Sequence, residues 1–391
     1  MLHKQTVKDI NVTGKTVLVR TMLNVPIDDD GSVGDKKRLE SAVPTLQYLL
    51  EQGAALVLMS HHSHEGQSLA VVAPVIAELL GCDVAFADDC LGEATTAKVQ
   101  ALRPGQVLML ENLRFHPEEE ANDEAFAKQL ASYGELYVND DFTTCHREHA
   151  SMVGVPKFLP AVAGLSVETE VNTITAALDN PKRPLIAVSG GAKISTKVPI
   201  ISFLLQKVDA LMIGGAMANT FLAAEGLQVG KSLIEDDEFE IARNVMDTAK
   251  ANNKTVLLPV DVVVTSDIDA HQNVRVVATN EVGEDDIIVD IGPASVGQLK
   301  QIVDPKGTVI WNGPMGIAED EVYDDGTLGV AQVIIESGAY SIVGGGDTAD
   351  FIDGAGLADK FGFVSNGGGA SLELMSGNTL PAIDVLLDKT S

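Results

Sequence analysis

The 391-residue chain has few cysteines, few aromatic residues and no long apolar run. Its three cysteines, Cys82, Cys90 and Cys145, show neither metal nor disulfide spacing, which is typical of a reducing compartment. No apolar stretch reaches the roughly 18 residues that cross a bilayer, and the segment MLHKQTVKDI has no apolar signal region. The sequence therefore predicts a cytoplasmic protein without a membrane partner.

Cationic residues are also scarce. The chain has 27 lysines and arginines against 56 aspartates and glutamates, which gives a formal net charge of −29. A surface of this sign repels polyanions, so we expect neither nucleic acid nor an anionic membrane as a partner. Any cluster of cations in such a chain therefore needs a local explanation.

Short apolar runs alternate with amphipathic helical patterns from end to end, as in βαβ units. The strand candidates of the first half are 16–20, 55–60, 106–111 and 135–140, and those of the second half are PLIAVS, ALMIG, TVLLPVDVVV, TVIWNG, YSIVG and FGFVS. The length favours two domains. We therefore predict an α/β fold of two doubly wound, Rossmann-like parallel-sheet domains, 1–165 and 182–371, joined by a helix hinge at 166–181, with a tail at 372–391.

Four glycine turns follow strand candidates of the second half. Two are triplets, Gly344 to Gly346 and Gly367 to Gly369, and two are doublets, at Gly190 and Gly214. A strand that ends in glycines and passes into a helix presents unpaired N–H groups and a positive dipole end, which together bind phosphate. Glycines also serve as packing devices in such turns, but four of them in one half favour a nucleotide site. Neither the dinucleotide fingerprint nor the Walker motif is present.

Cations end the strands of the first half. Arginine or histidine stands at or shortly after the end of each strand candidate there, at Arg20, His61 with His62, Arg114, and His146 with Arg147. Because arginine binds phosphate and carboxylate in a bidentate manner, this half is predicted to bind a small polyanion.

The second half adds two lysines, Lys193 and Lys197, which we expect four apart on one helical face, where they would neutralise a transferring phosphoryl group. Asp347, expected at a helix N-cap, would cap that helix, hold Mg²⁺, or do both.

The assembled motifs resemble the phosphoglycerate kinase family over nearly the whole length. They include VLVRTMLNVP, LENLRFHPEEE, YVNDDFTTCHREHAS, GGAKISTK, IGGAMANTF, WNGPMGI, GGGDTAD and SNGGGASLELM, in that order. The resemblance implies reversible phosphoryl transfer between 1,3-bisphosphoglycerate and ADP by a monomer. The N-terminal domain would bind the phosphoglycerate and the C-terminal domain MgADP or MgATP, with hinge closure joining them and the C-terminal tail returning to the first domain.

The resemblance also implies three groups of site residues. The acid substrate would lie against Arg20, Met22, Leu23, Asn24, Arg38, His61, His62, Ser63, His64, Arg114 and Arg147. The nucleotide would be bound by Lys197, Gly215, Asn312, Glu319, Gly345, Gly346, Asp347 and Thr348, with Asp347 also holding the metal. The moving phosphoryl group would be stabilised by Arg38, Lys193, Lys197 and the amides of Gly367, Gly368 and Gly369.

The chain departs from the family pattern in the acid site. Met22 stands where the family has an aspartate, His64 where it has an arginine, and Asp141 and Glu148 where it has small residues. These changes make the formal charge of the region more negative by two units and predict weakened phosphoglycerate binding.

Two alternatives remain open. One is a homologue that binds nucleotide with little or no turnover. The other is a metal site built from His and Cys with a carboxylate, which are ligands of Zn²⁺. Its candidate ligands are His62, His64, Cys145, His146, Glu148 and His149.

Overall fold

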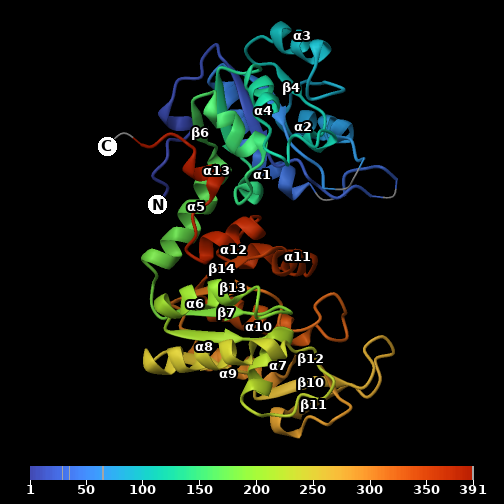
Figure 1. Ribbon diagram of the computed structural model, residues 1–391, viewed down its shortest axis with the longest axis vertical. Helices are drawn as coiled ribbons and strands as arrows, with labels where there is room; N and C mark the ends of the chain where they lie inside the picture. Colours follow the sequence, from blue (N-terminus) through green and yellow to red (C-terminus); the bar gives the residue numbers. More distant parts are fainter. Residues whose placement is uncertain (29, 35, 64–65, 390–391) are drawn as a thin grey trace. The chain divides into compact units, whose positions relative to one another are not determined.

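A computed structural model describes residues 1–28, 30–34, 36–63 and 66–389. The chain divides into two compact units. The first unit comprises Met1–Asn172 and the segment from Thr379 on, and the second unit comprises Thr173–Asn378 (Figure 1). Each unit holds a parallel sheet with helices, which confirms the predicted α/β class.

The first unit is built on a six-stranded sheet in the order β3-β4-β2-β1-β5-β6, and every neighbouring pair is parallel. The strands are β1 (Thr16–Thr21), β2 (Ala55–Met59), β3 (Val84–Phe86), β4 (Val107–Met109), β5 (Leu136–Asp140) and β6 (Ala161–Ala163), and the helices are α1 (Lys37–Glu51), α2 (Ala73–Leu80), α3 (Glu93–Ala101) and α4 (Glu124–Ala131). The central strands β2 and β5 are buried throughout, as expected when both faces of a parallel sheet are covered. The short strands β3 and β6 were not predicted.

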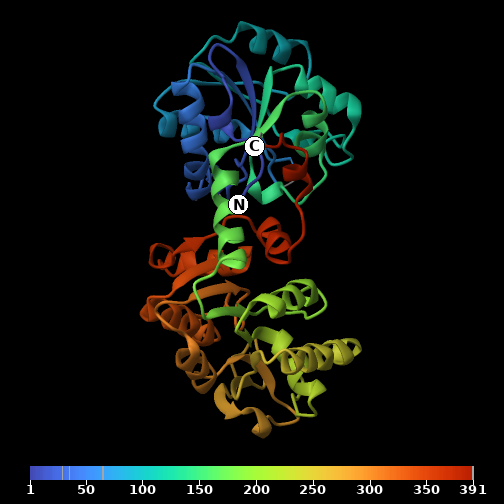
Figure 2. The same cartoon turned by 90° about the vertical axis from the view of Figure 1, so that its left-hand side faces the viewer.

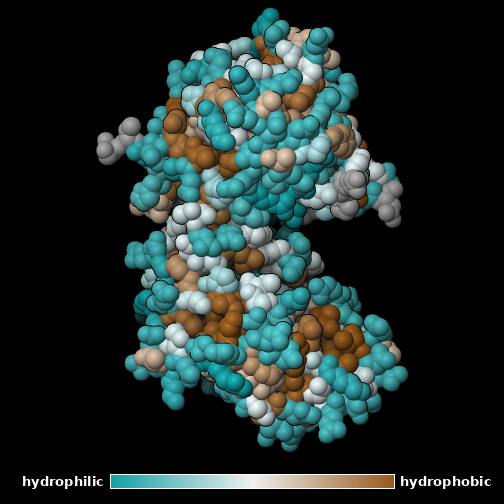
Figure 3. All heavy atoms as spheres, viewed as in Figure 1, coloured by the Kyte–Doolittle hydropathy of each residue, from teal (hydrophilic) through white to brown (hydrophobic). Residues whose placement is uncertain are grey.

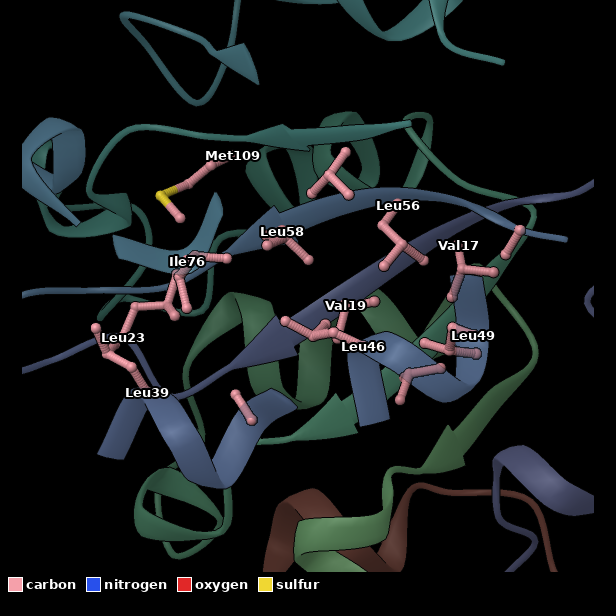
Figure 4. Packing of buried hydrophobic residues seen from close by; sticks show 14 of the residues in the cluster. Val17, Val19, Leu23, Leu39, Leu46, Leu49, Leu56, Leu58, Ile76 and Met109 are labelled. Atoms are coloured by element: carbon pink, nitrogen blue, oxygen red, sulfur yellow. The ribbon is translucent and has the colours of Figure 1, made fainter. Parts of the chain in front are cut away.

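The core of this unit lies between the sheet and its helices. In Figure 4, Leu46 and Leu49 of α1 lie beside the strand residues Val19 and Val17, and Leu39 lies beside Leu23. This packing fixes the strand ends, where the polar residues of the site lie.

The second unit contains a six-stranded parallel sheet in the order β15-β14-β13-β7-β8-β9. The strands are β7 (Leu185–Ser189), β8 (Ala210–Ile213), β9 (Thr255–Leu257), β13 (Thr308–Asn312), β14 (Tyr340–Gly344) and β15 (Phe363–Val364). The helices are α6 (Val198–Lys207), α7 (Gly215–Ala224), α8 (Phe239–Ala251), α9 (Pro293–Ile302), α10 (Asp325–Ser337), α11 (Gly346–Gly354) and α12 (Gly369–Met375). The only tryptophan of the chain, Trp311, is buried in β13.

A small antiparallel sheet corrects one prediction. The run TVLLPVDVVV, predicted as one strand, forms β9 and β10 (Asp261–Thr265), and these belong to different sheets. Pro259 lies between them and has no N–H group to continue a ladder. Strand β10 pairs with β11 (Arg275–Ala278) and β12 (Ile287–Ile291) in antiparallel fashion. Alternating apolar residues of these strands form a separate core with α7.

Helix α5 (Leu165–Asp179) begins in the first unit and ends in the second. Asp140, the last residue of β5, accepts a hydrogen bond from the amide of Ser166 in its first turn (2.9 Å). The C-terminal segment with α13 (Pro381–Asp384) belongs to the first unit (Figure 2). There the ammonium of Lys4 lies 2.7 Å from a carboxylate oxygen of Asp388. Among the described residues, no helix is long and apolar enough to cross a membrane.

Candidate active site

A buried polar network lies at the carboxyl ends of β1, β2 and β5. Its centre is Arg20, whose side chain is 0% exposed. The Nε atom donates to Ser151 Oγ (3.0 Å), Nη1 donates to Asp141 Oδ2 (2.7 Å), and Nη2 donates to His61 Nδ1 (2.7 Å). The guanidinium of Arg20 is therefore bonded to protein groups on several sides.

Three other predicted ligands of the acid substrate are buried as well. Met22 is 4% exposed and Leu23 is 0% exposed, so both belong to the core. His62 is also buried; its Nε2 lies 2.8 Å from the carbonyl oxygen of Val25, and its amide donates to the side chain of Asn112. The prediction that these side chains bind the substrate directly is wrong for this structure, because their polar and apolar surfaces face the protein.

The remaining predicted residues lie nearer the surface. The side-chain amide of Asn24 donates to Ser63 Oγ (2.7 Å), and Arg38 donates to the backbone carbonyl of Asn24 (3.2 Å). Arg147 is exposed. Arg114 is partly buried beside Glu120, and its Nε lies 3.0 Å from the Glu120 carboxylate. His64 lies outside the described residues.

The cations of this edge act on one another through space. Burial and the charges of Arg147 and Arg114 lower the pKa of His149 to about 4. The same two arginines, after burial and Arg20, also lower the pKa of His61. Both imidazoles are therefore neutral at physiological pH, chiefly because they are buried, and the positive field of the arginines that adds to this effect also attracts anions.

The metal alternative is wrong for its described members. Cys145 is buried and donates to the backbone carbonyl of Asp141 (3.3 Å), while the His62 ring faces Val25. Among the described residues, ligand atoms of three such side chains come within 4.8 Å of one another only at Asp89, Cys90 and His116. There His116 Nε2 and Asp89 Oδ1 already pair at 2.8 Å.

In the second unit, the two glycine doublets are packing devices. The amide of Gly190 donates to Asn312 O (2.9 Å), that of Gly191 to Pro314 O (3.0 Å), and that of Gly215 to Met315 O (2.8 Å). The amide of Gly214 donates to Ser189 O (2.9 Å). These turns therefore fasten the ends of β7, β8 and β13 together. The prediction that their amides hold phosphate is wrong.

The first triplet differs from the doublets. Gly346 and Asp347 open helix α11, and the first N–H groups of a helix have no intrahelical acceptor. Gly345 has φ +95°, and a Cβ there would collide with the side-chain amide of Asn312. Asn312 in turn donates to Gly344 O (2.6 Å) and accepts a hydrogen bond from Lys197. The buried amide of Asn312 thus holds the glycine turn and an ammonium group together.

The second triplet ends at a helix start in the same way. Gly368 is the N-cap of α12, with φ +48°, and Gly369 is its first residue. The Gly367 amide donates to Ser365 Oγ (3.0 Å), so it is not free for a phosphoryl group as predicted.

Three details of the nucleotide half differ from the prediction. Lys193 and Lys197 do not share a helical face, because α6 begins at Val198 with Lys197 as its N-cap. Asp347 is the second residue of α11, and the N-cap is Gly345. The hydroxyl of Thr348 is buried and accepts a hydrogen bond from the amide of Gly313 (2.7 Å), so it supports β13 instead of facing a ligand.

Asp347 and Lys197 are suited to a charged ligand. Among the described residues, the exposed Asp347 carboxylate accepts no hydrogen bond. Burial lowers the pKa of Lys197, and the charge of Asp347 raises it in part. The two groups therefore lie close enough to act together on phosphate and a cation.

A cavity of about 480 Å³ adjoins this turn. Its lining includes Glu319, Asp347 and Gly215, together with apolar residues of the small sheet and nearby loops. Figure 3 shows hydrophobic residues gathered over β12 and its neighbours. The apolar wall, with Leu233 and Ile288, was not predicted. The sequence feature that could have indicated this wall is the run of apolar residues in β12, but such a run is equally typical of a buried core strand.

A second cavity, of about 690 Å³, shares Glu319 and Asp347 with the first. Ala318 lines this second cavity. The two cavities are therefore adjacent, and both lie beside the glycine turn that opens α11.

Comparison with known proteins identifies the family of this chain. Residues 7–378 match the phosphoglycerate kinase family. The phosphoglycerate kinase of Chlorobaculum tepidum is 47% identical over 99% of this chain and 100% of its own length. That of Aquifex aeolicus is 45% identical and covers 100% of both chains. The solved phosphoglycerate kinase of Coxiella burnetii has a TM-score of 0.88 at 36% identity, with 98% of each chain covered.

Cations at the strand ends of one sheet and an open glycine turn at a strand end of the other are features expected of a phosphotransferase that acts on an anionic acceptor. The chain is a member of the phosphoglycerate kinase family, and thus a kinase.

Proposed function

We propose that the two units divide the reaction of the phosphoglycerate kinase family between them: the first unit binds the acid substrate, and the second unit binds the nucleotide with Mg²⁺. The reaction is the glycolytic transfer of a phosphoryl group between 1,3-bisphosphoglycerate and ADP, which gives 3-phosphoglycerate and ATP. The observation that carries the proposal is the turn at Gly345, where free amides, a lysine and a carboxylate meet.

The acid substrate lies against the cationic edge of the first sheet. Arg38, Arg114 and Arg147 supply permanent positive charge to a carboxylate and a phosphate. His61 adds a neutral N–H donor, and Asn24 adds an amide. In a chain with a net charge of −29, this edge is a local exception that concentrates small anions.

The nucleotide lies along the cavities of the second unit. The base occupies the apolar cavity beside Ile288, and Glu319 accepts hydrogen bonds from the ribose. The first-turn amides of α11 hold phosphate oxygens. The exposed carboxylate of Asp347 is an oxygen ligand of the kind that Mg²⁺ prefers, and it projects from the helix start that holds the phosphates. When bound, Mg²⁺ neutralises phosphate charge.

In the transfer, a terminal oxygen of ADP bonds to phosphorus while the bond from phosphorus to the acyl oxygen breaks, and the substrate leaves as a carboxylate. Such reactions depend on positioning and charge stabilisation more than on covalent catalysis. Lys197, fixed by Asn312, is placed to stabilise the charge of the moving group on the nucleotide side.

The test is a coupled assay of ATP formation from 1,3-bisphosphoglycerate, with calorimetry of MgADP binding. Lys197→Met should lower kcat by about 100-fold, the size of effect seen on removing a group that stabilises the transition state. The control Lys300→Met changes an exposed lysine paired with Glu336 and should leave kcat unchanged. Turnover that survives Lys197→Met would contradict the assignment. Nucleotide binding without any turnover would favour the binding-only alternative.

We further propose that the enzyme acts as a monomer in the cytoplasm, supported by three free cysteines and the strongly acidic composition. Sedimentation velocity of the purified protein measures the oligomeric state. Cell fractionation measures the compartment.

A further inference from the structure

The ion pair of Arg20 and Asp141 lies directly behind His61. Arg20 belongs to β1, and Asp141 follows β5, the neighbouring parallel strand. Both side chains are 0% exposed, and their closest atoms are 2.7 Å apart. Asp141 also accepts hydrogen bonds from Thr143 Oγ1 (2.5 Å) and Thr144 Oγ1 (2.9 Å). The carboxylate is therefore held from several sides.

Charge keeps this carboxylate ionised. Burial raises the pKa of Asp141, but Arg20, His61 and the two threonine hydroxyls lower it by more. The net pKa lies below the ordinary value. Arg20 is thus anchored by a full negative charge, and its direction is fixed.

The contact between Arg20 and His61 decides where the imidazole carries its proton. Arginine has only donors, so at 2.7 Å the Nδ1 atom of His61 must be the acceptor. An unprotonated Nδ1 means a neutral ring with its hydrogen on Nε2. Among the described residues, no acceptor pairs with that Nε2–H group. The ring is 7% exposed, so a ligand is the natural partner.

The surrounding charges agree with this state. His61 faces Arg20, Asp141, Arg114 and Arg147. Burial and the three cations favour the neutral ring, and Asp141 alone favours the protonated one. The cations prevail, so the pKa of His61 lies well below its usual range.

We propose that Asp141 is a positioning residue for the acid substrate: it anchors Arg20, and Arg20 holds His61 as a neutral ring whose Nε2–H binds a carboxylate or phosphate oxygen. The inference rests on the proposed function of the first unit, since it takes phosphoglycerate as the ligand of His61. It gives Asp141, where the family has a small residue, a role in binding that does not require contact with the substrate.

A double-mutant cycle separates this role from a purely structural one. Asp141→Asn keeps the shape but removes the charge, and it should raise the KM for 3-phosphoglycerate about tenfold, the loss of one good hydrogen bond. The KM for MgATP should not change. In the His61→Ala background, the same substitution should change the KM for 3-phosphoglycerate less than about twofold, because the group through which Asp141 acts is gone.

The control is Asp88→Asn, which removes an exposed carboxylate of the same unit and should change neither KM in either background. An equal effect of Asp141→Asn with and without His61 would overturn the proposal and leave Asp141 as a structural residue.

The tautomer of His61 can be measured directly by NMR, and this test needs neither a variant nor binding of 3-phosphoglycerate. In the wild type labelled with ¹⁵N-histidine, His61 should give the signature of the neutral Nε2–H tautomer from about pH 5.5 to 8. A ring that protonates near about pH 6.5, or that carries its hydrogen on Nδ1, would refute the proposal. Absence of 3-phosphoglycerate binding beside the expected tautomer would count against the proposed function alone.

Discussion

Two adjacent glycines of the first triplet should respond in opposite directions to the same substitution. In Gly345→Ala, the new residue must keep φ +95°, which costs a side chain about 1 to 3 kcal/mol. Its Cβ also collides with the amide of Asn312, which is 2% exposed and has little room to move. Displacing that amide breaks its bonds to Gly344 and Lys197, about 1 kcal/mol each. The sum is a loss of about 3 to 5 kcal/mol.

Gly346→Ala is the matched control. Gly346 is the first residue of α11, and nothing lies within 4 Å of a Cβ built there. Alanine reduces the freedom of the unfolded chain and suits a helix better than glycine, so the second unit should gain about 0.5 to 1 kcal/mol.

Trp311 makes the measurement selective. It is the only tryptophan, it is buried, and it precedes Asn312 in β13, so its fluorescence follows the unfolding of the second unit. Urea titrations of the wild type and both variants give the free energies of unfolding. Equal midpoints for the two variants, or a stable Gly345→Ala, would refute the argument from φ and the Asn312 contact. Calorimetry of MgADP should show weaker binding to Gly345→Ala, because the Lys197 contact is lost with the turn.

Further predictions concern pH, the buried end of β1 and the thiols. Burial raises the pKa of Asp290 from 3.8 to about 7, so the folded state holds a proton that the unfolded state releases. The contribution of Asp290 to the free energy of unfolding, about 4 kcal/mol, is therefore full below about pH 4 and is lost as pH rises through about 7. In urea titrations at several pH values, Asp290→Asn should weaken this dependence of stability on pH. An unchanged dependence would contradict the prediction. Met22→Asp buries a carboxylate and should lower the stability of the first unit by about 2 to 4 kcal/mol, whereas Met22→Leu should cost less than about 1.5, both measured by calorimetry. A thiol reagent should modify the half-buried Cys82 first, because burial strongly raises the pKa of the Cys90 and Cys145 thiols. Rapid reaction of either buried thiol in the native protein would contradict this order.

The two parallel sheets could be predicted because their strands are continuous apolar runs. Runs such as ALVLM of β2 are buried on both faces, and burial of this kind is visible in the sequence. The small antiparallel sheet was missed because β9 and β10 form one uninterrupted run around Pro259. Which sheet a strand joins depends on partners such as β12, and sequence alone does not contain that pairing.

The uses of the glycine turns could not be told apart from the sequence. Gly190 and Gly345 both follow apolar strands, yet the amide of Gly190 is taken by Asn312 O, whereas Gly345 precedes free helix amides. The difference is set by β13, more than 100 residues from Gly190, as the Lys197 contact with Asn312 across 115 residues illustrates. Local sequence identifies a turn that is able to hold phosphate, and only tertiary contacts decide whether its N–H groups are free.

The same reasoning changes the charge assigned to the acid site. The sequence pattern counts Asp141 as a negative charge facing the substrate, but its carboxylate pairs with Arg20 across 121 residues of sequence. The pair is neutral and buried, so it neither attracts nor repels an anion at the surface. The positive field of the site then comes from Arg38, Arg114 and Arg147. These three arginines are retained, although the chain differs from the family pattern elsewhere in the acid site. A trianionic substrate therefore meets the field of these three arginines, while Asp141 cancels the charge of Arg20, and the effect of Asp141 on binding passes through the proton of a neutral histidine.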